Sequence, residues 1–129
     1  MKDKFRKAVE NKDEQELIKC LNFNNLDKLD SNCFEYLEKA LKETWHSQHE
    51  DLVNTIYLEN LRDDRLVEPI LNIAIDRDHF RWYDDELEAT LRKCVHALKT
   101  INSDISNSAI EKLKELNNEN VKYVLEMYK

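Results

Sequence analysis

The chain contains no glycine in its 129 residues and a single proline. Glycine normally makes up about 7% of a globular chain, and it serves wherever the backbone needs a positive φ angle, as in phosphate-binding loops and tight hairpin turns. A GxGxxG dinucleotide loop, a Walker A loop and a GxSxG nucleophile elbow all require glycine, so the sequence excludes all three. A domain built of helices is the class that remains most compatible with this composition.

The hydrophobic pattern indicates helices throughout. Apolar residues recur at intervals of three and four along nearly the whole chain, and the two-residue alternation of a half-buried strand never persists. We therefore expect an all-α protein of about eight helices, forming one domain over residues 1–129. The expected helices cover residues 3–10, 13–21, 31–45, 47–61, 66–76, 84–101, 107–116 and 119–128.

Asparagine takes the place of glycine where these helices are expected to stop. Asn11, Asn22, Asn102 and the pair Asn117-Asn118 each stand at such a position. Asparagine is the usual second choice after glycine for the left-handed residue that ends a helix. The absence of glycine therefore fits a series of helices whose turns are closed by asparagine.

Charge, hydropathy and cysteine content exclude several kinds of site and partner. The 20 basic and 27 acidic residues give a formal net charge of −7, and no basic stripe is present, so we expect no nucleic-acid binding. No apolar run approaches the roughly 18 residues of a membrane span, and the charged start differs from a signal peptide, so we expect a cytoplasmic protein that does not enter membranes. Cys20, Cys33 and Cys94 never form a CxxC pair, which predicts reduced thiols and no cofactor or metal.

An internal repeat suggests how the helices are arranged. The segment that starts at Val67 aligns with the segment that starts at Ala109, an offset of 42 residues, and periods of about 40–47 residues are typical of HEAT and armadillo repeats. Residues 63–71 also resemble the turn and second helix of a HEAT repeat. We expect a HEAT-like α-solenoid of stacked antiparallel helix hairpins over residues 45–128, with residues 1–44 forming further N-terminal helices of unassigned type.

Three sequence blocks carry a narrower resemblance. They are Trp-His-Ser-Gln-His-Glu-Asp-Leu-Val at 45–53, Tyr-Asp-Asp at 83–85 and Leu-Arg-Lys-Cys-Val-His-Ala-Leu at 91–98. Together they resemble small bacterial HEAT-like proteins that act as immunity proteins for toxins delivered between competing cells, including contact-dependent growth inhibition systems. The chain departs from that pattern at His96, where an aromatic residue is expected, and at Lys99, where glycine is common.

Two catalytic or metal-binding interpretations compete with partner binding. His46, His49 and Glu50 have helical spacing, but their order is HxxHE, whereas the catalytic zinc motif is HExxH. Cys94 and His96 lie two residues apart, so on a helix they point to different faces and cannot form a nucleophile pair. We therefore expect no enzyme, no catalytic residue and no metal site.

The resemblance and the acidic charge together lead to a binding hypothesis. An acidic surface with aromatic anchors suits a basic protein partner, because carboxylates accelerate encounter and aromatic residues are enriched in binding hot spots. The residues expected to contact the partner are Trp82, Tyr83, Asp84, Asp85, His46, Glu50, Glu68 and Asn72.

The function expected from the resemblance is that of an immunity protein. It would be a monomer that forms a 1:1 heterodimer with its cognate toxin, a basic nuclease, and neutralises it by stoichiometric occlusion of the active site. The alternative is a cytosolic helical-repeat scaffold or adaptor that binds another protein and has no toxin partner.

Overall fold

A computed structural model describes the backbone of residues 2–22, 34–75 and 84–128, and the side chains of those segments except at residues 2, 3, 22 and 84–88. This described part forms eight α-helices and one short 3-10 helix, and it contains no β-strand. The expectation of an all-α protein is therefore confirmed. The helices are α1 (Lys2–Glu10), α2 (Glu14–Asn22), α3 (Phe34–Lys42), α4 (His49–Leu58), the 3-10 helix η3 (Asp64–Leu66), α5 (Val67–Ile75), α7 (Asp84–Ile101), α8 (Asp104–Lys114) and α9 (Glu119–Glu126).

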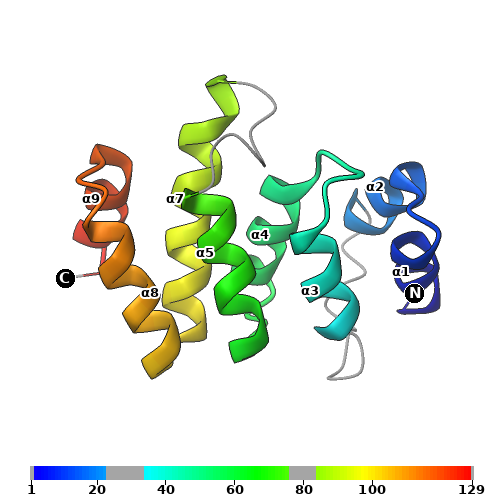
Figure 1. Ribbon diagram of the computed structural model, residues 1–129, viewed down its shortest axis with the longest axis horizontal. Helices are drawn as coiled ribbons and strands as arrows, with labels where there is room; N and C mark the ends of the chain where they lie inside the picture. The colour runs from blue at the N-terminus through cyan, green and yellow to red at the C-terminus, as the bar shows by residue number, and fades with distance from the viewer. Residues whose placement is uncertain (1, 23–33, 76–83, 129) are drawn as a thin grey trace.

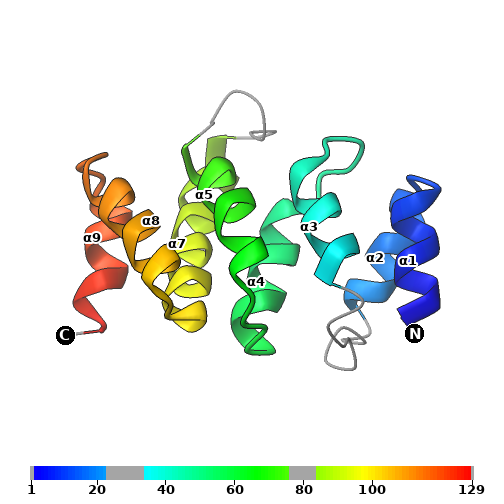
Figure 2. The same ribbon diagram turned by 60° about the horizontal axis from the view of Figure 1, so that its bottom comes forward.

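The helices lie in two layers. In one layer α1 contacts α3, α3 contacts α5, and α5 contacts α8. In the other, α2 contacts α4, α4 contacts α7, and α7 contacts α9. Across the two layers α1 pairs with α2, α3 with α4, α5 with α7 and α8 with α9, so the molecule is a row of helix pairs with the two termini at opposite ends (Figure 1). The turned view in Figure 2 shows the same succession from α1 to α9.

The core runs the length of this row between the two layers. Helix α7 lies at its centre, where it packs on α4, α5, α8 and α9. Its buried positions Leu91, Val95 and Leu98 recur at intervals of three and four, as expected for the apolar face of a helix. Every buried leucine contributes on the order of 1.5–3 kcal/mol to folding relative to an exposed one.

Residues with positive φ end four of the helices. They are Lys12, Asn60, Asn102 and Asn117, with φ between 50° and 55°. At Asn102 and Asn117 this agrees with the expected use of asparagine. After α1 the left-handed residue is Lys12, one position later than expected. There the amide of Asp13 donates to the carbonyl of Ala8 at 2.8 Å, which closes a Schellman motif.

Several helix boundaries differ from those expected, and two of the differences have a clear physical cause. Helix α3 ends at Lys42, before Trp45, because the loop that follows it satisfies the last carbonyls of the helix, as described below. Helix α8 begins at Asp104, three residues earlier than expected, because Ser103 and Ser106 form a reciprocal capping box at its start. The first turn of α8 therefore places Asp104 and Ile105 on the helix.

Candidate functional site

His46 and His49 form a buried pair in the connection between α3 and α4. Their exposed fractions are 2% and 3%, and their rings stack with centroids 4.4 Å apart. The Nε2 atom of His46 lies 2.7 Å from the carbonyl oxygen of Ala40, and Nε2 of His49 lies 2.8 Å from that of Glu43. The two imidazoles thus cap the carboxyl end of α3, where helix carbonyls have no partner within the helix.

The protonation state of His46 follows from its two hydrogen bonds. Its Nδ1 accepts a hydrogen bond from the amide of Gln48 at 3.0 Å, so the proton of the neutral ring is on Nε2, which donates to Ala40. Burial lowers the pKa of His46, against smaller opposing effects of the Ala40 carbonyl and of Glu14. With both nitrogens engaged and the ring buried, His46 offers no surface to a partner and no lone pair to a metal.

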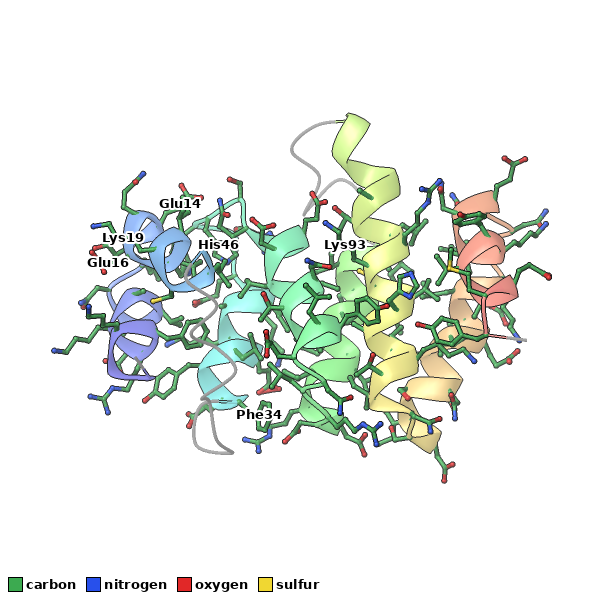
Figure 3. The ribbon with its side chains drawn as sticks, turned by 180° about the vertical axis from the view of Figure 1, so that it is seen from behind. Glu14, Glu16, Lys19, Phe34, His46 and Lys93 are labelled. Atoms are coloured by element: carbon green, nitrogen blue, oxygen red, sulfur yellow. The ribbon has the colours of Figure 1, made fainter. Side chains whose placement is uncertain are left out.

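Glu14 of α2 fixes the same connection from outside. One of its carboxylate oxygens accepts from the amide of Ser47 at 2.7 Å and from the hydroxyl of Ser47 at 3.2 Å. These hydrogen bonds lower the pKa of Glu14. Figure 3 shows Glu14 and His46 close together at this end of the molecule. The Trp-His-Ser-Gln-His block therefore joins α2, α3 and α4.

Glu50 is engaged between helices. Its carboxylate lies 2.7 Å from Nζ of Lys93 on α7, and both side chains are about half-buried at the α4–α7 contact. Figure 3 shows Lys93 on the face of α7 that is turned toward α4. This ion pair links the two helices with the largest shared interface, so the position of Glu50 is explained by the packing of the chain itself.

The thiols and His96 show no catalytic arrangement. Cys20 and Cys94 are buried free thiols, and burial raises the pKa of each, which opposes the thiolate form that a nucleophile needs. The Nδ1 atom of His96 lies 2.7 Å from the Tyr128 hydroxyl, and the His96 ring stacks on that of Tyr57. Cys33 lies outside the described residues.

The candidate site is a groove between α5 and α8, which lie side by side in both views (Figures 1 and 2). Its volume is about 690 Å³, within the range of 300–1,000 Å³ that is usual for ligand sites. The floor is apolar and buried, and the flanks carry two isoleucines that are 45% and 55% exposed. The lining residues are Asp64, Val67, Glu68, Leu71, Asn72, Ile75, Asp104, Ile105, Ser108, Ala109 and Lys112.

The charge of this groove is predominantly negative. Asp64, Glu68 and Asp104 supply three carboxylates, and Lys112 supplies the single ammonium group. None of these four side chains forms a hydrogen bond or an ion pair with another residue that the structure describes. By contrast, Glu111 on another face of α8 pairs with Lys114 at 2.9 Å. Charges left without a partner beside an apolar floor are available to a second molecule.

A smaller hollow of about 300 Å³ lies between α8 and α9. Its charged residues are Lys114, Lys122 and Glu126, so it carries two ammonium groups and one carboxylate. It lacks the three carboxylates of the α5–α8 groove, and we therefore take the larger groove as the candidate site.

Among the residues that the structure describes, Glu68 and Asn72 are the two expected partner contacts that line this groove. Glu68 is exposed on its wall and Asn72 is partly exposed beside it. Trp82 and Tyr83 lie outside the described residues. Asp84 and Asp85 form the start of α7, and their side chains lie outside the described part of the chain.

The sequence reasoning missed the residues that α8 contributes, namely Asp104, Ile105, Ser108 and Lys112. The signal for them was the Ser-Asp-Ile-Ser run at 103–106, whose spacing is that of a capping box with serine in place of the usual glutamate. The internal repeat was a further signal, because Val67 and Ala109, the two aligned positions, both line the groove.

Among the residues described, no three His, Cys, Asp or Glu side chains are grouped so that they could hold a metal ion. No helix in the described ranges is long and apolar enough to cross a membrane. No protein-family model, curated protein or solved structure matches the chain.

Proposed function

We propose that this protein is a non-catalytic immunity protein that binds a cognate bacterial toxin and neutralises it by stoichiometric occlusion. The observation that carries the proposal is the acidic groove between α5 and α8, where three carboxylates have no partner among the described residues and lie beside an apolar floor. A basic active-site cleft, such as that of a nuclease, is the complementary surface. The resemblance of residues 45–53 and 91–98 to toxin immunity proteins supports this choice of partner.

The electrostatics support a fast and specific encounter. The net charge of −7 attracts a basic partner over a distance of about one Debye length, which is about 8 Å at physiological salt. Within the groove the carboxylates of Glu68 and Asp104 would meet lysine or arginine side chains that otherwise hold a phosphate backbone. An inhibitor placed in this way needs no chemistry of its own.

The proposed architecture follows from the same row of helix pairs. We infer that the pairs are HEAT-like units of an α-solenoid, because consecutive pairs are stacked in two layers and the 42-residue offset aligns Val67 on α5 with Ala109 on α8. In such proteins each unit buries its apolar face on its neighbours, and the stacked units create an extended binding surface. The working form would be a cytoplasmic monomer that becomes a 1:1 heterodimer with the toxin.

Co-expression with the toxin domain encoded immediately upstream tests this function. The proposal predicts that cells survive toxin expression only when this protein is present, and that the two chains elute together at 1:1 stoichiometry in gel filtration. Unprotected cells, together with no complex after mixing of the purified proteins, would contradict it. Survival without any complex would contradict occlusion specifically, since occlusion requires stoichiometric binding.

A further inference from the structure

The side chains that line the α5–α8 groove are arranged in rows with a spacing of four residues. Rows of this kind are the ridges into which the side chains of another helix pack in the commonest class of helix contact. An extended strand would match a two-residue period instead. The rows are Asp64, Glu68 and Asn72; Val67, Leu71 and Ile75; Asp104, Ser108 and Lys112; and Ile105 and Ala109.

Each wall of the groove supplies one apolar row and one polar or charged row. The rows that begin at Val67 and Ile105 are apolar, and those that begin at Asp64 and Asp104 are polar or charged. Ile75 and Ile105 are 45% and 55% exposed, although the residues of the floor between them are buried. A guest with an apolar stripe and charged flanks would cover these isoleucines and meet both polar rows.

The groove is also polarised along its length. Figure 1 shows α5 and α8 running in the same direction, with both helices beginning at the lower edge of the view. Asp64 lies in η3, directly before α5, Glu68 lies in the first turn of α5 and Asp104 at the start of α8. Lys112 lies in the last turn of α8. One end of the groove is therefore acidic, and the other carries the single lysine.

We propose that the groove binds an amphipathic α-helix of the partner, antiparallel to α5 and α8, with lysine or arginine in its last turns and an acidic residue in its first turn. This inference rests on the proposed function, because it names the part of the toxin that would be bound. An antiparallel guest places its negative carboxyl end against the two positive amino ends of α5 and α8. Its basic residues then face Asp64, Glu68 and Asp104, and its acidic residue faces Lys112.

Two synthetic peptides of about 15 residues test the proposal directly, a length at which an isolated helix is marginal and gains order on binding. Both have leucine at every third or fourth position and capped ends. The first carries glutamate in its first turn and lysine in its last two turns, and the second has the same composition with these charges exchanged. Binding is measured by calorimetry, and the binding site is located from amide NMR shifts of the full chain.

The inference predicts that the first peptide binds at least tenfold more tightly than the second and shifts the amides of Leu71 and Ser108. A proline in the middle of the first peptide should abolish binding, because proline breaks a helix. In the variant Glu68→Gln with Asp104→Asn the preference between the two peptides should disappear. The matched variant Glu111→Gln with Glu115→Gln, on exposed positions at and just beyond the end of α8 outside the groove, should keep it.

Any of four results would overturn the helix-binding groove. They are equal binding of the two peptides, undiminished binding of the proline peptide, no binding of the first peptide, and amide shifts confined to other helices. These failures are distinguishable from failure of the proposed function. Protection against the toxin without peptide binding would reject only the helical guest. Peptide binding without protection would reject the toxin partner and leave the groove as a site for basic helices.

Discussion

The two histidines of the α3–α4 connection have a structural role that differs from the one their spacing in the sequence suggested. Their spacing suggested ligands or a contact surface, yet each ring donates to a carbonyl at the end of α3 and is almost fully buried. A buried carbonyl without a partner costs about 1–3 kcal/mol. The histidines supply that hydrogen bond at a place where glycine, the usual helix terminator, is absent.

The neutral state of His46 predicts a pH dependence of stability. Burial lowers the pKa of His46 from its ordinary value of 6.5 in the folded chain, so the unfolded chain takes up the proton first as the pH falls. The contribution of His46 is therefore complete above about pH 6.5 and is lost as the pH falls below it. Burial lowers the pKa of His96 as well, which adds to the same slope.

Urea unfolding measured at several pH values between about 5 and 8 checks this prediction. The free energy of unfolding should decline below about pH 6.5. The variant His46→Gln should be less stable at neutral pH by about 1–3 kcal/mol and should show a shallower decline. The variant His96→Phe isolates the second contribution. An unchanged slope in His46→Gln would mean that the pKa of His46 is the same in the folded and unfolded chains.

At the scale of elements, the type of structure was predictable and several helix ends were not. The three-and-four spacing of apolar residues located helices such as α7, whose expected and observed bounds are both 84–101. The end of α3 was missed because contacts with His46 and His49, made only after folding, decide it. The start of α8 was missed because a serine at the third helical position takes the usual place of glutamate in the capping box.

The same capping box supports a prediction for α8. Ser103 accepts from the amide of Ser106 at 3.1 Å, and the amide of Ser103 donates to the Ser106 hydroxyl at 2.8 Å. Ser103→Ala should lower the free energy of unfolding by about 1 kcal/mol. It should also increase amide exchange in the first turn of α8, while Asn107→Ala, an exposed control in the same helix, should change neither. If the two variants behave alike, the box does not hold this helix end.

In the molecule as a whole, the two helix layers differ in how their charged side chains are paired. In the layer that contains α4, α7 and α9, Glu50 pairs with Lys93, and His96 contacts Tyr57 and Tyr128. The opposite layer leaves the α5–α8 groove open, with its acidic residues unpartnered among the described residues. The sequence predicted an acidic binding surface that includes Glu68 and Asn72, and both residues line the α5–α8 groove. It could not show that α8 supplies the other wall, because that depends on the packing of helices more than 30 residues apart.

The affinity for the toxin domain, measured for two variants with matched charge reversals, tests whether the α5–α8 groove binds the partner. The variant Glu68→Lys with Asp104→Lys changes the charge of the groove, and Glu111→Lys with Glu115→Lys changes the net charge equally outside it. Thermal unfolding of both variants first establishes that they fold, since lysine in the first turn of a helix costs about 0.3–1 kcal/mol. We expect the groove reversal to weaken binding at least a hundredfold and the control to weaken it less than tenfold. Equal weakening by the two variants would mean that overall charge, and not the α5–α8 groove, binds the partner.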